Sequence, residues 1–160
     1  MPKIYPFKAV RATRDKVGLV VTRAYQSYEP TERKLRMRSN PFSFLHVINP
    51  GYKYQKVISG KKRYQLVKNR YQEFKEEGIF VQDQTPAIYL YKIVDRSKNI
   101  FFGIIATAEI ESYKNNSIKK HEDTIRRREE VFKDYLMTVG FNAEPVLVTY
   151  PDNPVIAEII

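Results

Sequence analysis

Two polar clusters in the sequence contain the residue types used in phosphate chemistry, and the denser one spans residues 119–124, KKHEDT. A glutamate such as Glu122 can act as a general base or hold Mg²⁺, and its neighbour His121 can bind phosphate or relay a proton. Lys120 and Arg128 carry the charge that neutralises a phosphoryl group in transfer. The cluster therefore indicates a candidate phosphoryl-transfer site with Glu122 and His121 as its chemical residues.

The same cluster also has a structural interpretation. Asp123 or Thr124 can cap the helix expected to follow, because both side chains accept hydrogen bonds from the first backbone N–H groups of a helix. The nearby arginines can pair with glutamates one turn further along a solvated face. The residue types alone favour this interpretation, while the positive end of the helix keeps Thr124 a candidate anion contact.

The second cluster spans residues 22–28, TRAYQSY, and follows the apolar run at residues 17–21. If that run is a strand, the cluster lies at its carboxyl end, where open sheets bind ligands. Arg23 and Tyr25 could then grip a phosphate and stack on a base. An ordinary loop whose tyrosines cover the edge of the core is an equally supported interpretation.

Several classes of site are excluded or unsupported by the sequence. The chain has no cysteine, which excludes a thiol nucleophile, a thiolate metal site and a disulfide scaffold. With His46 and His121 as its two histidines, the chain offers no nitrogen-rich metal site. It contains no GxxxxGK[ST], GxGxxG, GxSxG or HExxH motif. We expect His46 to be a hydrogen-bonded, partly buried histidine and assign no metal ligand.

The charge is strongly asymmetric along the chain. The net charge is +10, and residues 1–80 contain 18 Lys and Arg against 6 Asp and Glu, whereas residues 81–160 contain 10 against 12. A basic surface with interleaved tyrosines attracts polyanions, so a non-catalytic module that binds nucleic acid or a protein partner is the alternative function. No zinc finger, RNP sequence or GXXG loop supports it, and lysines and arginines on helices are usually solvated.

The hydrophobic pattern predicts the elements that hold these clusters. Period-3.6 stripes and stop signals predict helices, and short apolar runs predict strands. The two main stripes, each followed by a glycine stop, are Tyr64, Val67, Tyr71 and Phe74 before Gly78, and Ile125, Phe132, Tyr135 and Val139 before Gly140. The expected helices are residues 31–38, 61–77 and 123–139, and the expected strands are residues 17–21, 42–48, 79–81, 86–94, 100–110 and 145–150. Interleaved in this order, they predict an α+β fold in which two main amphipathic helices pack on a mixed β-sheet that includes a hairpin.

Length and composition predict one domain over residues 1–160. No apolar run reaches the roughly 18 residues of a membrane span, and the N-terminus does not resemble a signal peptide, so we expect a cytoplasmic location without membrane contact. The apolar residues 155–160 are expected to begin an element of a longer protein.

Four stretches of the chain resemble a bacterial and archaeal family described as domain of unknown function 1015, in the form of its Bacteroidetes-type members. They are residues 4–11 (IYPFKAVR), 39–50 (SNPFSFLHVINP), 120–124 (KHEDT) and 141–147 (FNAEPVL). The resemblance covers nearly the whole chain and implies the N-terminal portion of a longer protein.

The resemblance also implies a function. The later part of family members carries a DGHHR-like motif similar to that of ParB-like proteins and a free-serine kinase, which bind nucleotides and in some cases transfer or hydrolyse phosphate. It implies a ParB-like phosphotransferase or nucleotidase region that uses a nucleotide with Mg²⁺. This chain lacks DGHHR, and it reads Arg23-Ala24-Tyr25-Gln26 where many members have Pro-Pro-Tyr-Asp. Of this four-residue motif, the chain retains the tyrosine, at Tyr25.

If the two clusters form one site, they should face the same cleft. We therefore predict that the Glu122 carboxylate lies within about 10–15 Å of Arg23 or Tyr25, one nucleotide's reach, around a pocket of several hundred Å³.

Overall fold

The computed structural model describes residues 2–54, 57–122, 125–151 and 153–159. The chain divides into two compact units, each built from separate segments of sequence. Unit 1 comprises residues 1–9, 83–123 and 143–160, and unit 2 comprises residues 10–82 and 124–142. The expectation of a single domain stays a prediction.

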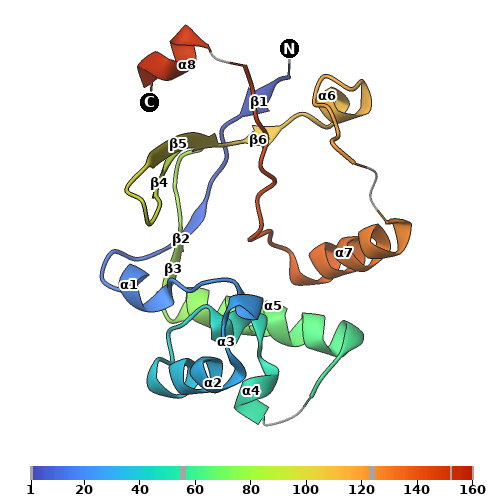
Figure 1. The fold of residues 1–160 in the computed structure, drawn as a ribbon. Helices are drawn as coiled ribbons and strands as arrows, with labels where there is room; N and C mark the ends of the chain where they lie inside the picture. The colour runs from blue at the N-terminus through green and yellow to red at the C-terminus, as the bar shows by residue number, and fades with distance from the viewer. Residues whose placement is uncertain (1, 55–56, 123–124, 152, 160) are drawn as a thin grey trace. The chain divides into compact units, whose positions relative to one another are not determined.

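Unit 2 holds most of the helices (Figure 1). Its strands β2 (Val10–Ala12) and β3 (Phe80–Gln82) pair antiparallel, with Arg11 opposite Val81. Its helical elements are α1 (Val17–Val20), the 3₁₀ helix η1 (Tyr25–Ser27), α2 (Pro30–Ser39), α3 (Leu45–Ile48), α4 (Gly51–Tyr54), α5 (Gly60–Glu76) and α7 (Arg126–Val139).

Helix α5 is the centre of the main core. The predicted stripe along it is confirmed: Val67 and Phe74 are buried, and Tyr64 and Tyr71 pack against the same cluster. Gly78 follows the helix with a φ of 68°, a left-handed conformation that glycine adopts without a Cβ clash. The buried residues of this core are Val20, Val47, Val67, Phe74, Ile79, Phe80 and Val139.

Helix α7 packs on α5 and runs parallel to it. Tyr64 meets the ring of Tyr135 edge-on at 5.2 Å, and Tyr71, about two turns further along α5, stacks on Phe141 at 4.1 Å. Gly140, at a φ of 79°, ends α7 with its N–H donating to the Leu136 carbonyl. The helix predicted for residues 123–139 is confirmed from Arg126 onward, and its expected first residues, Asp123 and Thr124, lie outside the described residues.

Unit 1 contains the remaining strands and two short helices. Strands β1 (Ile4–Tyr5) and β6 (Thr107–Ala108) form one antiparallel pair, and β4 (Tyr89–Val94) and β5 (Ile100–Ile105) form another. The helices are α6 (Ile110–Lys114) and α8 (Pro154–Ile159). The β4–β5 pair confirms the predicted hairpin. Its turn is closed by Asp95, whose carboxylate accepts a hydrogen bond from the Asn99 backbone N–H at 2.8 Å.

The α+β class is confirmed, and the sheets differ from the expected one. Across the described ranges the strands form three two-stranded antiparallel sheets in place of one mixed sheet. The strands predicted at residues 17–21 and 42–48 are wrong, because these segments form α1 and α3. A short apolar run fits a buried strand and a buried helical turn equally well, so its period could not separate them.

The strand predicted at residues 145–150 is also wrong, since that segment has no regular secondary structure. Its side chains alternate too little to define one buried face, and Val146 and Leu147 are both almost fully exposed. Among the residues that the structure describes, no helix has the length and apolar character needed to cross a membrane.

Candidate functional site

An open hollow of about 800 Å³ lies between α5 and α7 within unit 2, and we call it the α5–α7 groove. The turns of α5 and α7 that face each other each contribute aromatic and basic side chains to the groove. The groove is lined by Arg63, Tyr64, Ile125, Arg127, Arg128, Val131, Phe132 and Tyr135.

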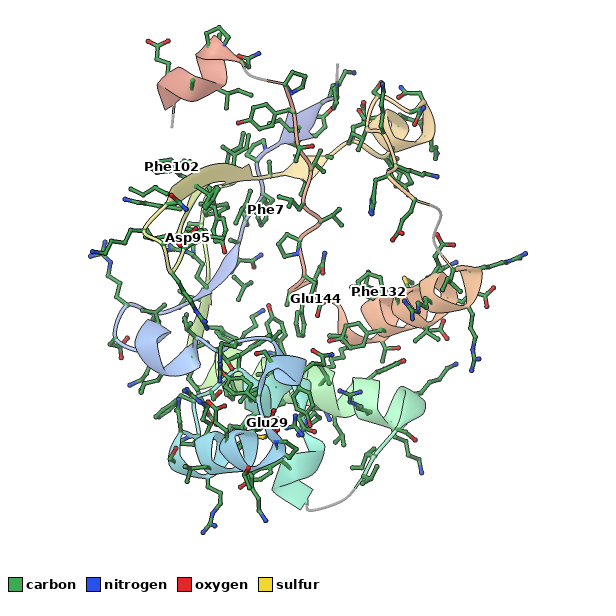
Figure 2. All side chains as sticks on the ribbon, viewed as in Figure 1. Phe7, Glu29, Asp95, Phe102, Phe132 and Glu144 are labelled. Atoms are coloured by element: carbon green, nitrogen blue, oxygen red, sulfur yellow. The ribbon has the colours of Figure 1, made fainter. Side chains whose placement is uncertain are left out.

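The floor of the groove is aromatic. Phe132 and Tyr135 lie three residues apart on α7, so their rings share one face of the helix, with planes 16° apart and centroids at 6.3 Å. The Tyr135 ring is held in turn by Tyr64 of α5. Phe132 remains 45% exposed, and Figure 2 shows it on α7. An exposed ring supported from behind by packed rings is a ready surface for stacking another planar group.

The rim of the groove is basic. Arg63 is exposed and donates one hydrogen bond from its guanidinium to the Ile48 carbonyl at 3.1 Å. Arg127 and Arg128 are exposed in the first turn of α7. Arg126 pairs with Glu130 at 3.6 Å, whereas neither Arg127 nor Arg128 has an acidic partner in the described part of the chain. Three guanidinium groups that can contact phosphate therefore line the same groove as the exposed Phe132 ring.

Sequence reasoning found only part of this groove. It selected Arg128 and placed Ile125, Phe132 and Tyr135 on one helix face, but it did not combine them with Arg63 and Tyr64 of α5. The two stripes were visible in the sequence. Their pairing was not, because it depends on the tertiary packing of α5 on α7.

The predicted chemical residues lie in unit 1, at the end of the segment that follows α6. His121 Nε2 lies 3.7 Å from Glu122 Oε1, and the two side chains are 92% and 73% exposed. Lys120 Nζ lies 4.5 Å from the centre of the Tyr113 ring, a cation–π contact. Thr124, the other predicted contact, lies outside the described residues. Water screens the interaction of these two exposed side chains, and their role as chemical residues stays a prediction.

The structural interpretation of this cluster gains one observation. Arg126 and Glu130 lie four residues apart on α7 and pair across an exposed face, as the sequence predicted for these arginines and glutamates. Within residues 2–54, 57–122, 125–151 and 153–159, no group of three His, Cys, Asp or Glu side chains could hold a metal ion.

Arg23 belongs to an internal network of unit 2. Its guanidinium lies 4.3 Å from the centre of the Tyr28 ring and donates to Glu32 Oε1 at 2.6 Å. Arg36 donates to the same carboxylate oxygen at 3.1 Å. Burial raises the pKa of Glu32, but hydrogen bonds from Arg36 and Arg23 outweigh it and hold the pKa below its ordinary value. Arg23 is thus already neutralised by a carboxylate.

Tyr25 and Tyr28 also have structural partners. Tyr28 is 3% exposed and forms a small core with Met37 and Leu45, against which Tyr25 packs. The Arg33 guanidinium lies 4.1 Å from the centre of the Tyr25 ring. These contacts favour the interpretation of residues 22–28 as a loop that covers a core. Since this loop lies in unit 2 and Glu122 in unit 1, a cleft shared by the two clusters stays a prediction.

His46 has the environment expected of it, on a helix instead of a strand. Its Nε2 lies 2.9 Å from the Met37 carbonyl and 3.2 Å from the Asn40 carbonyl, so Nε2 carries the proton. Burial lowers the pKa of His46, with a smaller contribution from the positive charge of Arg70. The histidine also lines a cavity of about 290 Å³ on the α3 side of α5. Its hydrogen bonds tie α3 to the end of α2.

The fold and the groove define an α+β protein with a basic, aromatic surface site. A family model described as "Protein of unknown function (DUF1015)" matches residues 4–160, and the chain therefore belongs to this family. Neither a curated protein nor a solved structure matches the chain.

Proposed function

We propose that the chain binds a nucleotide in the α5–α7 groove. The base stacks on Phe132, and the phosphates contact Arg63, Arg127 and Arg128. The proposal is supported by one observation: the exposed Phe132 ring lines the same groove as three arginines. Two of these arginines lack an acidic partner among the described residues.

Each part of the groove matches one part of a nucleotide. A base stacked on an aromatic side chain gains about 1–3 kcal/mol, whichever base it is. Guanidinium groups bind phosphate oxygens through paired hydrogen bonds, which lysine cannot form. Unit 2 also contains 20 Lys and Arg against 9 Asp and Glu, so its field attracts anions toward the groove.

The finer proposal is a phosphotransferase or nucleotidase of ParB-like type. In this reaction Glu122 acts as the general base, and His121 binds the phosphate or relays a proton. Lys120 and Thr124 contact the phosphate anion. Mg²⁺ would arrive on the nucleotide. Arg23 and Tyr25 are its outer ligand contacts, though their existing partners, Glu32 and Arg33, must then move. The support for this reaction is the adjacency of His121 and Glu122 beside a lysine.

Calorimetric titration of the protein with ATP, ADP and CTP, with and without Mg²⁺, tests nucleotide binding. We expect Phe132→Ala and Arg128→Gln each to weaken binding about tenfold, since each removes one contact of the groove. Arg38→Gln on α2 removes an exposed arginine of the same unit outside the groove and should bind like the unaltered protein. Equal affinity in all three variants would exclude the groove.

The reaction is tested separately by measuring phosphate release. Glu122→Gln and His121→Ala should abolish turnover and leave the affinity for nucleotide within about twofold, because the binding contacts lie in the groove. If neither change alters turnover or binding, these two residues have no role in the site.

A further inference from the structure

We infer that the nucleotide held in the α5–α7 groove is one unit of a single-stranded nucleic acid. This inference rests on the proposed function, because it keeps the same stacking ring and the same arginines. It adds that the ligand is a polymer that continues beyond the groove at both ends.

The first argument is the shape of the site. Pockets for small ligands are usually enclosed and bury most of the ligand surface. The α5–α7 groove is an open hollow, and the apolar side chains along its α7 wall, Ile125, Val131 and Phe132, are all exposed. An open surface leaves room for a strand to continue on both sides of the base that stacks on Phe132.

The second argument is the distribution of charge around the groove. Because α5 and α7 run parallel, the first turns of both helices lie at the same end of the groove. Those turns contribute Arg63 from α5, and Arg127 and Arg128 from α7. Lys61 and Lys62 are two further exposed cations in the first turn of α5, next to the groove lining. Three arginines at one end of the groove, with two lysines beside them, suit consecutive phosphates of a strand better than the single phosphate of a nucleoside monophosphate.

The third argument concerns strandedness. Stacking on Phe132 requires a base whose flat face is free, and a duplex hides those faces between neighbouring pairs. Single strands offer one exposed base per nucleotide, and proteins that bind them combine a basic groove with aromatic platforms in this way. The chain's lack of a sequence-reading motif fits recognition by stacking and charge, which tolerates many sequences.

An anionic membrane surface is the competing partner for an exposed basic helix. Helix α7 presents Met137, which is strongly exposed, together with its arginines. However, Glu129, Glu130 and Asp134 lie on the same helix and offset its positive charge. Membrane-surface helices carry a predominantly basic polar face. None of these three acidic residues is among the described residues that line the groove, so the groove is basic while the helix surface as a whole is not. This favours a strand held in the groove over a membrane, and the test includes both.

The experiment is fluorescence anisotropy with a labelled oligothymidylate of about 12 nucleotides and the whole chain, with thymidine monophosphate as competitor. If the three arginines neutralise three phosphates, the logarithm of the binding constant should fall with the logarithm of the salt concentration at a slope of about −2. Arg63→Gln or Arg128→Gln should each make this slope less steep by about 0.7. Phe132→Ala should weaken binding about tenfold at an unchanged slope.

Matched controls separate these effects from general changes. Phe101→Ala removes an exposed phenylalanine of unit 1, and Arg38→Gln removes an exposed arginine of unit 2, and both should leave affinity and slope unchanged. Circular dichroism checks that every variant keeps its helices.

The outcomes distinguish the inference from the proposed function. If the oligomer binds no more tightly than thymidine monophosphate while Phe132→Ala still weakens both, the polymer inference fails and nucleotide binding stands. If neither ligand binds even at low salt, both fail. Binding to phosphatidylserine vesicles without binding to the oligomer would also overturn the inference in favour of a membrane surface.

Discussion

The two units of the chain differ in what they bury. Within the described ranges, unit 2 holds all ten buried hydrophobic side chains, whereas the one buried residue of unit 1 is the polar Ser112. Unit 2 also has a net charge of +11 and unit 1 of −1, from 20 basic against 9 acidic and 8 against 9 residues. The core and the excess positive charge therefore belong to the same unit.

The hairpin of unit 1 illustrates the difference. In β4 and β5, Leu90 and Phe102 point to one face and Tyr91 and Phe101 to the other, and all four are about half exposed (Figure 2 labels Phe102). An antiparallel pair with one covered face would alternate apolar and polar residues. Here both faces are apolar, so burial contributes little to the stability of the hairpin in this chain. Its stability comes from backbone pairing and from the turn at Asp95.

The largest expected contrast is in core truncation. Phe74→Ala should reduce the free energy of unfolding by about 3–5 kcal/mol, because the ring is fully buried against α3, β3 and its own helix. Phe102→Ala in the hairpin should cost less than about 1 kcal/mol, since that ring is already half in water. Urea unfolding monitored by circular dichroism measures both. Similar costs for the two changes would contradict the comparison.

A smaller contrast is expected at two glycines. Gly140→Ala should destabilise unit 2 by about 1 kcal/mol, because Gly140 ends α7 at a φ of 79° that a Cβ disfavours. Gly103 of β5 has no positive φ and no atom within 4 Å of an added Cβ, so Gly103→Ala should be neutral or slightly stabilising. Thermal melts of the two variants provide the measurement. A loss at Gly103 as large as at Gly140 would show that the hairpin is more constrained than its exposure indicates.

His46 makes unit 2 sensitive to acid. Its pKa is lowered in the folded state by burial, so the unfolded chain binds the proton more tightly. Stability is therefore full above the unfolded value of about 6.5 and falls as the pH drops from there toward the lowered folded value. We expect the unfolding midpoint to decrease from pH 7.5 to pH 5.5, and His46→Gln to reduce that decrease. An unchanged pH dependence in His46→Gln would exclude this histidine as its origin.

The sequence predicted the parts of the fold that local patterns determine. The stripe of Tyr64, Val67, Tyr71 and Phe74 predicted α5, and the positions of Gly78 and Gly140 predicted the ends of α5 and α7, because a helix period and a left-handed stop are both local. The hairpin followed from two β-rich runs separated by a polar turn.

The sequence failed where tertiary contacts decide. The run at residues 17–21 forms α1, whose Val20 is buried in the main core and accepts the backbone N–H of Phe44, and neither contact can be read from the local pattern. The sequence assigns the groove residues to two separate helices, because no local pattern shows that Tyr64 packs against Tyr135. Arg23 and Tyr25 have the chemistry of a ligand site, but Glu32 and Arg33 occupy them as partners. The residue types of Arg23 and Tyr25 predict which ligands they can bind, but they do not predict their partners inside the fold.

The smallest expected effect is at the surface charges, and salt is its signature. Glu32 accepts hydrogen bonds from both Arg23 and Arg36, so Glu32→Gln leaves two arginines of unit 2 close together without their shared anion. In unit 1, Glu111 pairs with Lys114 at 2.7 Å on an exposed turn of α6, and Glu111→Gln removes only that pair. Exposed ion pairs contribute little to stability and are screened by salt.

We therefore expect Glu32→Gln to lower the unfolding midpoint slightly at low salt and not at about 1 M NaCl, where screening acts within a few Å. Glu111→Gln should have no measurable effect at either salt concentration. If Glu111→Gln were as costly as Glu32→Gln, the two units would not differ in how their charges support the fold, and the contrast between them would be limited to the core.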